Sequence, residues 1–181
     1  MIVINLFGGP GIGKSTIAAG VFSMLKLRGV NCELVTEYAK DLTWDEDWDT
    51  LSDQMKVTDE QYKRVKRLEG KVDVVITDSP ILGGAMYCNN SYIIGYIHHV
   101  HNKFDNRNFL LNRVKPFSDV GRSQTEDEAV EIDQRLRWYC GSKASQLDGD
   151  YTAIGHIVDY VIDECLINNN NEVYSISKDK K

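Results

Sequence analysis

Two patterns of hydrophobic positions recur along this chain of 181 residues. Short unbroken apolar runs predict buried strands, because a sheet covered on both faces leaves its strands no polar side. Apolar residues spaced three and four positions apart predict amphipathic helices. The expected strands are 2–7, 32–35, 72–77, 107–112 and 151–154, and the expected helices are 15–28, 50–68, 91–103, 125–140 and a last one ending near 166.

Strands and helices therefore alternate, which predicts an α/β fold with a central parallel sheet of about five strands and helices on both faces. Two helix ends carry local signals. Gly29 should terminate the first helix, and Thr125-Glu126-Asp127-Glu128 fits the capping box that opens another. We expect one domain over residues 1–167 and a flexible tail over 168–181, which holds an asparagine run and ends in charged residues.

Composition narrows the class of protein. Acidic residues number 27 against 21 basic ones, a formal net charge of −6. That balance argues against a protein that coats nucleic acid, although a local basic groove stays possible. The four cysteines are far apart and form no Cys-x-x-Cys pair, so neither a zinc site nor a disulfide framework is expected. With no run long enough for a membrane span or a signal peptide, we expect a cytoplasmic protein.

A glycine-rich segment links the first strand to the first helix. It matches Gly-x-x-x-x-Gly-Lys-Ser without a gap. Its glycines let backbone N–H groups converge on phosphate oxygens, and the helix dipole favours the same anion. A turn that matches by chance is the alternative, but the strand–loop–helix context argues against it. We predict a phosphate loop for ATP, with Lys14 acting on the β- and γ-phosphates; its residues are Gly8, Gly9, Pro10, Gly11, Ile12, Gly13, Lys14, Ser15 and Thr16.

Asp78 follows the third strand. In proteins with this loop, an acidic residue at such a place supports Mg²⁺. The alternative is an aspartate that only caps the next segment. We expect Mg²⁺ to be held by the Ser15 hydroxyl and by Asp78, directly or through water.

Two further features indicate a compact phosphotransferase. The run Thr36-Glu37-Tyr38-Ala39-Lys40 directly follows the second strand, and a carboxylate at such a strand end faces the ligand crevice. Glu37 can take a proton from an acceptor hydroxyl or bind a sugar or base, unless it is a surface residue that starts a helix. The loop 113–124 carries Arg113, Lys115 and Arg122. We expect this loop to close as a lid and stabilise the transition state with its cations; a generic basic surface loop is the alternative.

Other classes of phosphate-loop protein fit less well. GTP-specific proteins usually read guanine with Asn-Lys-x-Asp, which the chain lacks. Large AAA machines need a helical lid domain and many more residues.

The order of these motifs resembles a known family. Between the phosphate loop and the capping box come Glu37-Tyr38-Ala39-Lys40-Asp41, Asp78-Ser79-Pro80, Asp105-Asn106-Arg107-Asn108-Phe109, Arg113-Val114-Lys115-Pro116-Phe117 and Gly121-Arg122-Ser123-Gln124. Over residues 1–165 the chain looks like the small P-loop kinase-type ATPases common in bacteriophages, and it is similar to the kinase domain of ribosylnicotinamide kinases. The resemblance implies a nucleoside- or nucleotide-kinase fold with a mobile lid and Mg²⁺-ATP as donor, in the host cytoplasm if a phage encodes it. It does not fix the acceptor, and Lys40 stands where ribosylnicotinamide kinases tend to carry arginine.

The predicted reaction is transfer of the γ-phosphate of ATP to a nucleoside, a nucleotide or a related acceptor. Two alternatives stay open: a kinase acting on hydroxymethylated bases in DNA, and a P-loop ATPase module that works with a protein partner. The basic run at Lys63, Arg64, Lys66 and Arg67 can grip an acceptor phosphate or DNA, or form a solvated face. Trp44 and Trp48 can stack on a base or pack a small insertion. His98, His99 and His101 do not share one helix face, so no metal site is expected there.

Overall fold

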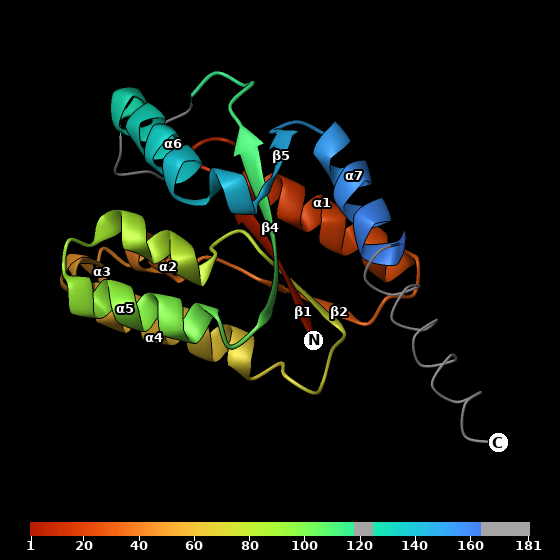
Figure 1. Cartoon of the computed structure of the whole chain (residues 1–181), viewed down its shortest axis with the longest axis horizontal. Helices are drawn as coiled ribbons and strands as arrows, with labels where there is room; N and C mark the ends of the chain where they lie inside the picture. Colours follow the sequence, from red (N-terminus) through yellow and green to blue (C-terminus); the bar gives the residue numbers. More distant parts are fainter. Residues whose placement is uncertain (118–124, 164–181) are drawn as a thin grey trace.

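The sheet at the centre of the fold has five strands, all parallel, in the order β2-β3-β1-β4-β5 (Figure 1). The computed structural model describes residues 1–117 and 125–163. The α/β fold and the sheet of about five parallel strands that the sequence predicts are confirmed. Arg122, the second half of the expected lid and the expected tail lie outside the described residues. The strands are β1 Ile2–Phe7, β2 Cys32–Val35, β3 Val74–Thr77, β4 Asp105–Asn112 and β5 Ser145–Asp148.

Helices cover both faces of this sheet (Figure 1). On one face α1 and α7 pack together, while α4, α5, α6 and η1 bury their apolar sides against the other. The helices are α1 Lys14–Leu27, α2 Tyr38–Trp44, α3 Trp48–Ser52, α4 Gln54–Lys66, α5 Ser91–His101, α6 Glu126–Cys140 and α7 Thr152–Tyr160, with 3₁₀ turns η1 Ile81–Tyr87 and η2 Gly141–Lys143.

Strand β1 shows why the apolar runs form the centre. Its side chains alternate between the two hydrophobic clusters: Ile4 and Leu6 face α1 and α7, whereas Val3 and Phe7 face the opposite layer. All six residues of β1 are buried. A strand covered in this way needs apolar residues on both faces, so the sequence run predicts it well.

Two sequence predictions need correction. The strand expected at 151–154 is wrong, because these residues are a turn and the start of α7. The last strand is β5, at the edge of the sheet, whose Ser-Gln-Leu-Asp sequence has no apolar run. The single helix expected over 50–68 is divided between α3 and α4, because Asp53 caps the start of α4 by accepting hydrogen bonds from the N–H groups of Met55 and Lys56. The capping box at Thr125 is present as predicted.

The turn after β5 packs directly on the phosphate loop. The N–H of Gly149 donates to the Asn112 carbonyl at 2.9 Å. A Cβ at Gly149 would lie 2.8 Å from the carbonyl oxygens of both Asn112 and Ile12. Only a glycine therefore lets the turn approach β4 and the loop this closely.

We expect Gly149→Ala to destabilise the protein by about 1–3 kcal/mol, because the added methyl group meets backbone atoms that cannot move aside cheaply. The measurement is the free energy of unfolding from urea titration. Gly155→Ala is the matched control, since a Cβ there meets open space among the described residues and alanine favours a helix. Equal stability of the two variants would contradict the tight packing of this turn.

Candidate active site

The phosphate loop is formed by the chain between β1 and α1. Gly11 and Gly13 have φ of +80° and +107°, a region that residues with a Cβ rarely adopt. The side chain of Ile12, between them, is 1% exposed and belongs to the cluster under α1 and α7. The loop is therefore anchored in the core by one side chain while its glycines turn the backbone, as the motif requires.

Lys14 lies across the mouth of this loop. Its Nζ donates to the carbonyl oxygen of Gly8 at 2.7 Å and to that of Gly9 at 3.2 Å. The ammonium group thus lies beside the N-terminus of α1. Its formal positive charge and the partial positive charge of the helix dipole both attract an anion bound there. That position is suited to a polyphosphate.

Asp78 follows β3, which pairs with β1, so its carboxylate comes to the same edge of the sheet as the loop. The residue is 3% exposed. Within the described part of the chain, its Oδ1 is a buried atom with no hydrogen-bond partner. A buried carboxylate oxygen is costly unless a ligand satisfies it. With Ser15 lining the same cavity, the donor set is two oxygens of the type that Mg²⁺ prefers.

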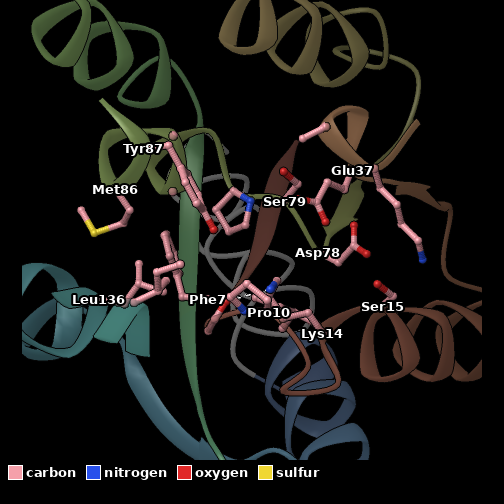
Figure 2. A pocket seen from close by; sticks show the side chains of 18 of the residues that line it. Phe7, Pro10, Lys14, Ser15, Glu37, Asp78, Ser79, Met86, Tyr87 and Leu136 are labelled. Carbon is pink, nitrogen blue, oxygen red and sulfur yellow. Dashed lines mark hydrogen bonds between the residues drawn. The ribbon is translucent and has the colours of Figure 1, made fainter. Parts of the chain in front are cut away.

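A cavity of about 410 Å³ extends from the phosphate loop toward α4 and η1 (Figure 2). Its charged lining residues are Lys14, Glu37, Lys40 and Asp78. Beyond them the walls are uncharged and largely apolar: Ala39, Thr43, Leu51, Gln54, Val57, Gly83, Gly84, Met86, Tyr87, Ile132 and Leu136. The side chains that α4, η1 and α6 contribute to the lining are thus all uncharged, and the charged ones come from the phosphate loop, the ends of β2 and β3 and the start of α2.

Glu37 and Tyr87 line this cavity together (Figure 2). Glu37 is the residue before α2 and is partly exposed. Desolvation in the cavity wall raises the pKa of the Tyr87 phenol to about 12, and the negative charge of Glu37 contributes. Tyr87 is 55% exposed as a whole residue, and like any tyrosine it keeps its proton at neutral pH and can donate a hydrogen bond. Sequence reasoning did not find it, since the segment 81–87 carries no motif.

The segment from Arg113 to Phe117 lies against the phosphate loop. Arg113 binds Asp133 of α6, with 2.8 Å between Nε and Oδ2, and also donates to the Pro10 carbonyl. Its Nη1 is a buried donor without a partner among the described residues. A Cβ on Gly11 would lie 3.0 Å from the Phe117 ring.

Lys115 lies in the same segment, and its Nζ would be 3.7 Å from a Cβ on Gly13. The structure therefore brings Arg113 and Lys115 to the loop; Arg122 is not among the described residues. Asp133 is a site residue that the sequence did not single out.

Several other candidates lie elsewhere. Arg64 pairs with Asp41 at 2.8 Å and with Glu60 at 3.3 Å, and Lys63 pairs with Asp59. This favours a surface ion-pair network over substrate binding for the basic run. Of the described residues, those that line the cavity include none of the run.

The aromatic and histidine candidates also lie apart from the cavity. Trp44 and Trp48 are 64% and 51% exposed. His101 is buried, which lowers its pKa to about 4 with the help of His98. In the two described ranges, no group of three His, Cys, Asp or Glu side chains is placed to hold a metal ion.

A family model described as an AAA domain matches residues 3–141. The chain belongs to this AAA domain family. Among proteins with curated functions, none matches it. No described helix of this AAA domain is both long and apolar enough to cross a membrane.

Solved structures with the same fold include deoxyadenosine kinase from M. mycoides. With the products dCMP and a flexible dCDP bound, that enzyme superposes with a TM-score of 0.51 at 17% identity, covering 88% of this chain and 98% of its own. With dCTP bound, the TM-score is 0.54 at the same identity and coverage. These similarities confirm the predicted P-loop fold.

Lys14→Ala removes the cation at the loop, where charge stabilisation is a dominant catalytic term. We expect ATP turnover to fall by at least ~10²-fold, the scale of losing one such group. Lys26→Ala is the matched control, because Lys26 lies on the same helix but pairs with Glu33 at the surface. Near-normal turnover by a folded Lys14→Ala protein would refute the assignment of the phosphate loop.

Proposed function

We propose that this protein is an ATP-dependent phosphotransferase that moves the γ-phosphate of ATP to the hydroxyl group of a nucleoside or a similar uncharged small molecule. The observation that carries the proposal is the division of one cavity into a charged end at the phosphate loop and a neutral end beneath α4 and η1. A donor and an acceptor bound at these two ends would meet near Glu37 and Asp78.

At the charged end, the loop supplies backbone N–H groups to the phosphates of ATP. Bound Mg²⁺ would neutralise charge on the phosphate oxygens, and Ser15 and Asp78 are the residues suited to hold it. Lys14 stabilises the developing charge on the transferring group. Arg113 has a donor at Nη1 that a phosphate oxygen would satisfy, and Lys115 adds a third cation beside Gly13. The fold shared with a deoxyadenosine kinase agrees with this donor role.

At the neutral end, the uncharged side chains that the described parts of α4, η1 and α6 contribute to the lining favour an uncharged acceptor. A monophosphate would need cations to replace its water. Lys40 is the one lining cation outside the phosphate loop in the part of the chain that the structure describes, and it is exposed. Gln54, Thr43 and Tyr87 offer hydrogen bonds without charge, as recognition of a base and sugar requires.

The same cavity argues against a base within DNA as acceptor. Its volume of about 410 Å³ is that of a small-molecule site. Thr43 and Leu51 line it, and the segment between them, which includes the first residues of α3, carries Asp45, Glu46, Asp47 and Asp49. These carboxylates would repel a phosphate backbone. A free nucleoside carries no phosphate and meets no such barrier, and neither does ribosylnicotinamide, although its pyridinium ring is cationic.

A panel of acceptors with radiolabelled ATP tests this proposal. The panel contains nucleosides, their 5′-monophosphates, ribosylnicotinamide and DNA with hydroxymethylated bases. We expect label to be transferred to an uncharged hydroxyl acceptor, with ATP turnover dependent on that acceptor. Equal ATP turnover with and without every acceptor would instead support an ATPase module that acts with a protein partner.

Glu37 is the expected base in this reaction, since a hydroxyl must lose a proton as its oxygen attacks the γ-phosphorus. The carboxylate takes this proton while the bond to the β–γ bridging oxygen breaks and ADP leaves. Glu37→Gln preserves shape but removes basicity, so we expect kcat to fall by about 10²–10⁴-fold. Glu33→Gln, an exposed change on β2 beside Lys26, should leave kcat unchanged. A normal kcat for Glu37→Gln on a hydroxyl acceptor would leave Glu37 only a binding role.

A further inference from the structure

An ion pair from two other elements holds the first half of the phosphate loop. Asp133, on α6, accepts a hydrogen bond from the N–H of Gly9, with 2.6 Å between Oδ1 and the nitrogen. Its second oxygen accepts from Arg113 Nε at 2.8 Å. Arg113 follows β4 and donates from Nη2 to the Pro10 carbonyl at 2.8 Å. One ion pair thus fixes a donor and an acceptor of two successive loop residues.

The contact between α6 and the loop is tight as well as polar. A Cβ on Gly9 would lie 2.5 Å from Asp133 Oδ1 and 2.6 Å from the Ala129 carbonyl. The side chains of Arg113 and Asp133 are only 15% and 16% exposed. Solvent and salt screen such a pair less than a surface pair. The glycine at position 9 therefore has a reason beyond phosphate binding: it lets the helix approach the loop.

Arg113 and Asp133 carry opposite charges, and they lie next to a loop suited to bind a polyanion. A carboxylate beside the phosphate loop would by itself repel nucleotide phosphates. Arg113 cancels that charge while it binds the Pro10 carbonyl. Loss of Arg113 would therefore do more harm than loss of one hydrogen bond, because it uncovers the negative charge of Asp133.

We propose that Asp133 and Arg113 are a positioning pair that shapes the phosphate loop before the nucleotide arrives. The inference rests on the proposed function only in that the loop binds nucleotide phosphates. Because Asp133 engages the N–H of Gly9 and Pro10 has none, the loop donors left for phosphate beyond these two positions are those of residues 11–16. The pair also joins the loop to α6 and to the end of β4.

Binding of ADP with Mg²⁺, measured by calorimetry, tests the hydrogen-bond part. Asp133→Ala and Asp133→Asn remove the same charge, but only asparagine keeps an oxygen that can accept from the Gly9 N–H. We expect Asp133→Ala to weaken ADP binding by roughly tenfold, the scale of one lost hydrogen bond, and Asp133→Asn to restore most of that affinity. Asp127→Asn, an exposed change in the first turn of the same helix, is the matched control. Equal affinities for the alanine and asparagine variants would overturn the positioning role of Asp133.

The charge part is tested with Arg113→Met, alone and combined with Asp133→Asn. We expect Arg113→Met to weaken ADP binding by about 10–100-fold, as loss of hydrogen bonds from a charged group does. Adding Asp133→Asn should recover at least about tenfold of this loss, because it removes the uncovered carboxylate. If the pair acts on stability alone, the double variant should bind ADP no more tightly than Arg113→Met does. That result would overturn the proposal.

Two readouts keep the outcomes separate. Thermal unfolding without nucleotide identifies any variant that fails to fold; if Asp133→Ala is such a variant, the comparison of Arg113→Met with the double variant decides. If the wild-type protein itself bound no ADP, the proposed function would fail rather than the positioning pair. If the wild-type protein binds ADP and no variant differs from it, the positioning pair is refuted.

Discussion

The site depends on one constraint: the loop after β1 must keep its backbone N–H groups directed at an anion. No regular secondary structure holds this loop in place. The fold meets this need by fixing the loop at several points. Ile12 anchors it in the core, and the turn at Gly149 packs on its backbone. Asp133 and Arg113 bind its first half, and Phe117 lies against Gly11. A loop fixed in this way has little ordering entropy left to lose when phosphate binds.

The sheet order explains why the other reacting groups come to the same place. In the order β2-β3-β1-β4-β5, β3 lies beside β1, and β2 lies on the far side of β3. Their carboxyl ends carry Asp78 and Glu37, so a parallel sheet places both carboxylates at the edge where the phosphate loop begins. The cations gather on the loop side, and α4 with η1 closes the neutral side. The strand order thus places the charged side chains and the uncharged walls of the cavity on different elements.

The sequence predicts the parts of this arrangement that local physics determines. Buried strands need unbroken apolar runs, and the phosphate loop needs glycines at fixed spacing, so β1, α1 and the loop are all predictable. The edge strand β5 is not, because its polar sequence lacks a run and its place depends on pairing with β4. The break between α3 and α4 depends on one capping side chain, Asp53.

The site residues divide in the same way, into those that the neighbouring sequence identifies and those that depend on contacts with distant parts of the chain. Asp78 and Glu37 are recognisable because each lies within two residues of the carboxyl end of a strand. Tyr87 and Asp133 are not, since each gains its role from elements far away in the chain: the bond from Gly9 to Asp133 spans 124 positions. The basic run at 63–67 shows the opposite case. Its local pattern suggests a phosphate-binding surface, but Lys63, Arg64 and Lys66 form ion pairs with nearby carboxylates.

The central claim is that the neutral end of the cavity selects an uncharged acceptor while the loop holds the donor. The most direct measurement compares the binding of a nucleoside with that of its own 5′-monophosphate, in the presence of Mg²⁺ and a non-hydrolysable ATP analogue. The account predicts that the nucleoside accepted in turnover binds at least about tenfold more tightly than its monophosphate, since the added charge would lose its water without gaining a cation. Tighter binding of the monophosphate would contradict the account and identify a nucleotide as the acceptor.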